Sequence, residues 1–158
     1  MLSQKMLNET SQGNVKEVKR LISRGVDVNS SNRYGVTPLM VACLCNWPEV
    51  VRLLLDEGAD TERKESFFGC TALMFACMSG GWDSVQLLLE QGAEVEVMDT
   101  LQRTALTVAR SVDNREAVRL LLQWGAKERG KSVGHVRKTT RVSRGESANQ
   151  CSDPTLPI

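Results

Sequence analysis

The side chains of this sequence that could do chemistry are five cysteines and one histidine. A structural zinc site needs Cys and His ligands that come in pairs at short spacing. Only Cys43 and Cys45 form such a pair, and His135 lies far along the chain. A serine or cysteine nucleophile needs a histidine held beside it as a base, and the sole histidine falls in a tail that we expect to be disordered. We therefore expect no catalytic residue, metal, cofactor, small-molecule substrate or enzyme activity.

The cysteines are better explained by packing and by cellular compartment. Cys43 and Cys77 each follow an alanine in corresponding stretches, which favours small, buried apolar side chains. An odd number of cysteines argues against the disulfide framework of a small secreted domain. No apolar run approaches the length of a membrane span, and the first residues lack a secretory signal. We expect a cytoplasmic or nuclear protein, or one found in both.

Three stretches of the chain nearly repeat one another. They begin at Thr37, Thr71 and Thr104, which are 34 and 33 residues apart. A period of about 33 residues is typical of a protein built from stacked repeats. Such proteins present an extended surface rather than an enclosed pocket, so the period favours a binding function.

Each stretch predicts two short helices. Thr37 and Pro38 are typical of a helix start, Asn46 is typical of the tight turn that follows, and Gly58 ends the second helix with a positive φ. Neither helix is long enough to be stable alone, so the units must stack. The leucines that we expect to pack between units are Leu54, Leu88 and Leu121.

The first and last units differ from the middle ones. Residues 1–33 form a degraded copy with a polar outer face, as a capping repeat requires. We expect its first helix at residues 2–11, with Leu2, Met6 and Leu7 facing inward. Arg110 replaces the repeated cysteine in the last unit and should meet solvent. Trp47 and Trp82 are expected to cover the edge of the core, and the sequence leaves the role of Trp124 open.

The repeated pattern G-x-T-P-L-x-x-A, a turn, and V-V-x-L-L-L-x-x-G-A-D resembles the ankyrin repeat. The resemblance covers residues 1–129, in units of about 1–33, 34–66, 67–101 and 102–129. It implies an all-α repeat solenoid of about four stacked helix-turn-helix units joined by β-hairpin loops. The family histidine is missing from all full units, which implies modest stability. One extra residue is expected within residues 62–69.

The resemblance also implies a function and a set of contact residues. Ankyrin arrays bind other proteins through their hairpin tips and the concave face of their first helices, without a catalytic centre. We therefore predict a monomeric, non-enzymatic adaptor for a partner protein or peptide. The family contact positions fall on Arg33, Tyr34, Val36, Leu44, Phe67, Phe68, Met78, Leu101 and Arg103, and also on Cys45, Cys70, Ser79, Thr100, Ser111 and Val112.

This contact set is unusually apolar for loop tips. Three of the four Tyr and Phe residues of the chain belong to it, and an exposed apolar patch usually marks an interaction site. We predict a groove for an extended or helical peptide, lined by Tyr34, Leu44, Phe67, Phe68, Met78 and Leu101. In the alternative interpretation, the extra residue folds Phe67 or Phe68 back onto the stack.

Residues 130–158 lose the repeat and are rich in Ser, Thr, Gly and basic residues, which predicts a disordered tail. Residues 127–158 carry a net charge of +4, which leaves −3 for residues 1–126. The tail is compatible with a nuclear-import signal, a nucleic-acid or acidic-lipid patch, a phosphorylated segment, or plain solvation. The alternative function is therefore a nuclear or nucleic-acid-associated adaptor tethered by this tail. The sequence is also compatible with a fragment or isoform of a larger scaffold.

Overall fold

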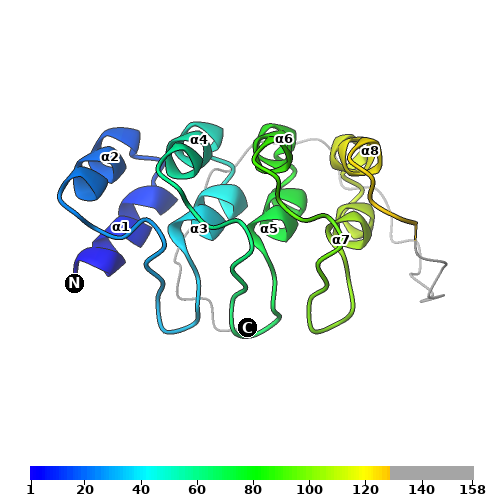
Figure 1. Ribbon diagram of the computed structural model, residues 1–158, viewed down its shortest axis with the longest axis horizontal. Coiled ribbons are helices and arrows are strands. Elements are labelled where there is room, and N and C mark those ends of the chain that lie inside the picture. The colour runs from blue at the N-terminus through cyan, green and yellow to red at the C-terminus, as the bar shows by residue number, and fades with distance from the viewer. Residues whose placement is uncertain (129–158) are drawn as a thin grey trace, which may run out of the picture.

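The computed structural model describes residues 1–128, which form helices joined by turns and loops (Figure 1). The eight helices of this part of the chain are α1 (Leu2–Ser11), α2 (Val15–Ser23), α3 (Pro38–Leu44), α4 (Pro48–Asp56), α5 (Ala72–Ser79), α6 (Trp82–Glu90), α7 (Ala105–Ser111) and α8 (Arg115–Gln123).

The helices stand as four antiparallel pairs in a row (Figure 1). The first helices α1, α3, α5 and α7 form one layer, and the second helices α2, α4, α6 and α8 form the other. Each helix packs against its counterpart in the next pair. Three loops, 24–37, 57–71 and 91–104, project beyond the layer of first helices. The predicted all-α repeat solenoid is confirmed, and the predicted unit boundaries fall inside these loops.

Local sequence signals start and stop the helices as predicted. The N–H of Met40 donates to the Thr37 hydroxyl at 3.3 Å, and Pro38 occupies the first turn of α3. The turn between α3 and α4 contains Asn46 with a φ of 56°, and Gly58 follows α4 with a φ of 85°. The left-handed backbone conformation expected at both places is therefore present.

The core is a continuous cluster that runs through all four pairs. Leu54, Leu88 and Leu121 are fully buried in it, as predicted. Cys43 and Cys77 are buried free thiols of the same cluster. Burial raises the pKa of the Cys77 thiol to about 12 and raises that of Cys43 further, so both behave as small apolar side chains.

Three details of the fold differ from the predictions. Residues 1–128 contain no β-strand, because each projecting loop is closed by too few cross-loop hydrogen bonds to form a ladder. Leu2 is exposed, because α1 buries Met6, Leu7 and Thr10 and leaves Leu2 outside the core. Trp47 packs against the core and its indole N–H donates to the Ser11 carbonyl at 3.0 Å, but Trp82 lies on the surface.

Other predictions for the ends of the array have mixed outcomes. Arg110 is exposed, as predicted, and forms an ion pair with Glu128. Trp124, whose role the sequence left open, is also exposed. Our predictions for the tail lie outside the described residues. None of the helices in residues 1–128 is long and apolar enough to cross a bilayer.

The substitution Leu88→Asp should unfold the array, because Leu88 is buried between neighbours on both sides. It removes about 1.5–3 kcal/mol of apolar transfer energy and buries an unpaired charge at a further cost of several kcal/mol. The total is comparable with the stability of a typical domain, about 5–15 kcal/mol. Far-UV circular dichroism should show loss of the helical signal.

The matched control for this prediction is Leu122→Asp. Leu122 belongs to the same kind of helix but its side chain is 39% exposed, so a carboxylate there can reach water and the helical signal should remain. A soluble, fully helical Leu88→Asp protein would refute the packing described above.

Candidate functional site

The tips of the three loops are held by one polar side chain each, at equivalent places in the repeat. These anchor residues are Asn32, Glu65 and Asp99, 33 and 34 residues apart. In the first loop, the N–H groups of Tyr34 and Val36 donate to Asn32 Oδ1 at 2.9 and 3.1 Å. A side chain that accepts local backbone N–H groups in this way replaces the hydrogen bonds of a regular strand or helix. Each tip therefore has a defined shape without being part of a sheet.

Glu65 holds the second tip with three hydrogen bonds. The N–H of Phe67 donates to Oε2 at 2.7 Å, and the N–H groups of Phe68 and Cys70 donate to Oε1 at 2.8 and 3.0 Å. The Glu65 side chain is buried. A carboxylate is seldom buried without hydrogen-bond partners, and these three N–H groups supply them. Its three bonds fix the backbone of both phenylalanines.

The second loop is one residue longer than the others, as predicted. Its closing hydrogen bond joins Glu65 to Cys70, whereas those of the other loops join Asn32 to Val36 and Asp99 to Arg103. The extra residue therefore lies between Glu65 and Cys70. Glutamate is one methylene longer than aspartate or asparagine, which lets its carboxylate reach the amides of the longer loop.

Asp99 holds the third tip, where the sequence lacks the expected glycine. The N–H groups of Leu101 and Arg103 donate to Oδ1, both at 2.9 Å, and the Arg103 guanidinium donates to Oδ2 at 2.8 Å. Gln102 adopts a φ of 59° in place of glycine. The third loop thus has the same turn as the first, and its buried aspartate stabilises it.

The tips are also joined to one another by their backbones. The N–H of Ser66 donates to the Tyr34 carbonyl, and the N–H of Thr100 donates to the Phe68 carbonyl, both at 2.8 Å. Each accepting residue lies just before a glycine of positive φ. The three tips therefore form one continuous ridge, which we call the tip ridge and define as residues 32–36, 64–70 and 98–103.

The tip ridge exposes large apolar side chains. Phe67 is 54% exposed, Phe68 is 49% exposed and Leu101 is 59% exposed. The Tyr34 and Phe67 ring centroids are 5.1 Å apart, and the Arg33 guanidinium lies 4.6 Å from the Tyr34 centroid. Neither phenylalanine is folded back onto the stack, so the alternative interpretation of the extra residue is wrong. The row runs from Arg33 through Tyr34 to Phe67.

The remaining predicted contact residues do not all join this row. Leu44 is exposed and Met78 is half-buried, and both lie near the carboxyl ends of first helices. A helix of seven residues is about 10 Å long, which separates these two from the loop that precedes the same helix. Val36 and Arg103 are half-buried within their loops. Cys45 and Cys70 are buried, so the structure contradicts them as contact residues.

The anchor residues were missed by the sequence analysis, although the sequence contained a signal for them. Three successive repeats have a polar residue at the same position, namely Asn32, Glu65 and Asp99. The side-chain oxygen of each accepts the backbone N–H group of a residue two or more positions further along the loop. A loop position that is polar in every repeat differs from ordinary solvated loop positions, where the residue type varies from repeat to repeat. Burial of the two acidic anchors could not be read from residue type.

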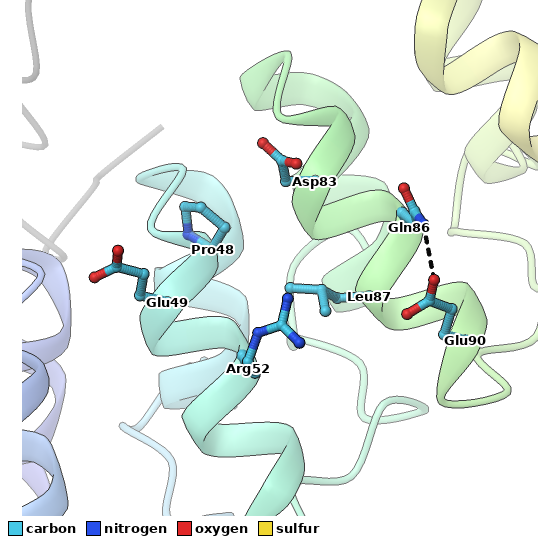
Figure 2. A pocket seen from close by; sticks show the side chains of 7 residues that line it. All are labelled: Pro48, Glu49, Arg52, Asp83, Gln86, Leu87 and Glu90. Carbon is cyan, nitrogen blue, oxygen red and sulfur yellow. Dashed lines mark hydrogen bonds between the residues drawn. The ribbon is translucent and has the colours of Figure 1, made fainter.

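A separate depression of about 440 Å³ lies between α4 and α6, in the layer of second helices. Figure 2 shows Arg52 of α4 reaching toward α6, while Glu49 points away from that helix. The Gln86 amide donates to Glu90 at 2.8 Å. The lining residues are Pro48, Glu49, Arg52, Asp83, Gln86, Leu87 and Glu90. Within residues 1–128, no group of three or more His, Cys, Asp or Glu side chains could hold a metal ion.

The family of the chain follows from its repeats. The sequence model of a family described as "Ankyrin repeats (3 copies)" matches residues 7–65 and 62–132. The chain belongs to the ankyrin repeat family. Ankyrin repeats are generally protein–protein interaction modules and are typically non-enzymatic, which agrees with a surface made of loop tips.

Individual relatives match over one or two ankyrin repeats. Human mitochondrial disaggregase is 42% identical over 62 residues, which are 39% of this chain and 9% of that protein. The mouse ankyrin repeat, SAM and basic leucine zipper domain-containing protein 1 is 50% identical over 48 residues, 30% of this chain and 10% of that protein. A Saccharomyces cerevisiae ankyrin repeat-containing protein is 47% identical over 51 residues, 32% and 10% of the two chains. The chain spans about a tenth of these relatives.

Removing the second anchor should distort the tip that carries both phenylalanines. Glu65→Ala leaves three backbone N–H groups without their acceptor and should cost at least about 2 kcal/mol of unfolding free energy in urea. Glu65→Gln should cost less, because one oxygen can still accept the two hydrogen bonds made to Oε1. Amide chemical shifts of residues 67, 68 and 70 should move in both variants.

Glu49→Ala is the matched control for this measurement. The Glu49 side chain is exposed and forms no ion pair within residues 1–128, so its removal should change stability by less than about 0.5 kcal/mol. Equal stability of the Glu65→Ala and Glu49→Ala variants would show that Glu65 does not hold the tip.

Proposed function

We propose that this ankyrin repeat chain is a non-enzymatic adaptor that binds a partner polypeptide on the tip ridge. The observation that carries the proposal is the exposure of Phe67, Phe68 and Leu101 on loops whose backbones are already fixed. Exposed large apolar side chains are unfavourable in water, and a contiguous group of them usually marks an interaction site. The partner supplies the apolar cover that residues 1–128 do not provide at the ridge.

The fixed backbone of the ridge favours binding. A loop that is ordered only on binding loses conformational entropy at that moment, which weakens the complex. Here the loops are held by Asn32, Glu65 and Asp99 and by hydrogen bonds between neighbouring tips. Aromatic side chains bury about 150–250 Å² each, so two phenylalanines on a fixed loop are effective anchors for a partner.

The first helices offer a second, weaker part of the proposed interface. Leu44 is exposed at the end of α3, and Met78 is half-buried near the end of α5. A partner that covers the ridge and continues along these helices reaches both residues. We propose that the adaptor acts as a monomer in the cytoplasm or nucleus, without a cofactor. The alternative role for the basic tail depends on residues beyond those that the structure describes.

The double substitution Phe67→Ser and Phe68→Ser should abolish partner binding and leave the fold intact. Both rings are about half exposed, and the main packing lost is the Tyr34–Phe67 contact. That contact stabilises the fold by about 1 kcal/mol, so the melting temperature should fall by only a few degrees. Affinity capture with the full chain, followed by mass spectrometry, should show partners that the double variant fails to retain.

Trp82→Ser is the matched control, because Trp82 is 49% exposed, as Phe68 is, but begins α6 in the other layer. It should retain every partner of the unsubstituted chain. The proposal fails if both variants capture the same proteins as the unsubstituted chain. A double variant that unfolds would instead assign the phenylalanines to the core.

A further inference from the structure

We propose that the segment bound on the tip ridge is acidic as well as apolar, with carboxylate side chains beside large hydrophobic ones. This inference rests on the proposed function and adds the chemistry of the partner. It follows from which charged side chains of the ridge are buried and which are exposed.

Every carboxylate of the ridge is already engaged inside it. Glu65 and Asp99 are the only acidic residues in the three tips, and both are buried. Glu65 accepts three backbone N–H groups, and Asp99 accepts two together with the Arg103 guanidinium. The ridge therefore shows no carboxylate to a partner.

Two of the three cations of the ridge lie at its surface, and the third, Arg103, is paired with Asp99. Arg33 and Lys64 are exposed, and neither forms an ion pair within residues 1–128. The exposed charge of the ridge is consequently positive. A basic segment would be repelled there, and an uncharged one would cover these two cations without pairing them, which costs free energy.

Both cations are held in place by contacts within the ridge. The Arg33 guanidinium lies 4.6 Å from the Tyr34 ring centroid, and Lys64 Nζ donates to the Met98 carbonyl of the next loop at 2.9 Å. Side chains placed in advance lose little rotamer entropy when a carboxylate pairs with them. An apolar partner also excludes water from the pairs, which strengthens them relative to an exposed ion pair. A guanidinium can bind a carboxylate through two parallel hydrogen bonds.

One groove of the opposite layer has the reverse charge. The groove between α4 and α6 is lined by three exposed acidic residues, Glu49, Asp83 and Glu90, and by one arginine, Arg52 (Figure 2). An acidic partner is repelled from this groove and attracted to the ridge. Such a distribution of charge orients an encounter before contact is made.

The test is selection of peptides from a displayed library of random 12-residue sequences on the immobilised full chain. The informative peptides are those that no longer bind the Phe67→Ser and Phe68→Ser double variant. We expect them to combine aromatic or aliphatic residues with a net negative charge. The double variant Arg33→Glu and Lys64→Glu should weaken their binding by at least about tenfold. Renewed selection on this variant should yield basic peptides.

The control variant is Lys16→Glu and Lys19→Glu. These two lysines are exposed on α2, away from the ridge, and the substitution alters the net charge by the same amount. It should leave peptide affinity nearly unchanged. Ridge-dependent peptides without an acidic excess, or an equal loss of affinity in both charge variants, would overturn the inference and leave the proposed function standing. Absence of any ridge-dependent peptide would overturn both.

Discussion

The packing of each helix pair against its neighbours is the interaction on which the rest of this structure depends. The helices have between 7 and 10 residues, and helices of this length are marginal on their own in water. They persist because one buried cluster passes through all four pairs. In such an array, stability is approximately a sum over units and the interfaces between them. An interior side chain such as Leu88 therefore contributes to two interfaces at once.

Repetition of the same packing requires different side chains where the array meets water. The last unit has Thr107 and Arg110 exposed where the interior units have buried methionine and cysteine, and Arg110 pairs with Glu128. The same end keeps an apolar part, because Leu122 of α8 is exposed while its counterpart Leu89 is buried. In the final unit, α7 thus has polar side chains where the array meets water, whereas α8 keeps the apolar side chain of an interior unit.

The loops solve a different physical problem, which is to keep an irregular backbone fixed at the surface. Backbone N–H groups that are shielded from water need partners, and here buried anchor side chains and neighbouring loops supply them. Once the backbone is fixed in this way, the tip side chains do not have to be buried. Phe67, Phe68 and Leu101 can then face solvent. The same arrangement engages both acidic side chains of the ridge in hydrogen bonds and leaves Arg33 and Lys64 exposed.

The sequence by itself determined the helical architecture, because its signals act over a few residues. Thr37, Asn46 and Gly58 mark helix starts, turns and ends through local backbone preferences, and the apolar spacing identifies the buried leucines. Only the tertiary structure decided which loop side chains are exposed. Contacts between residues 32 apart, such as Ser66 with Tyr34, place the phenylalanines outside. The burial of Glu65 likewise depends on three amides that its loop brings together, and the exposure of Leu2 and Trp82 depends on how their helices meet the next pair.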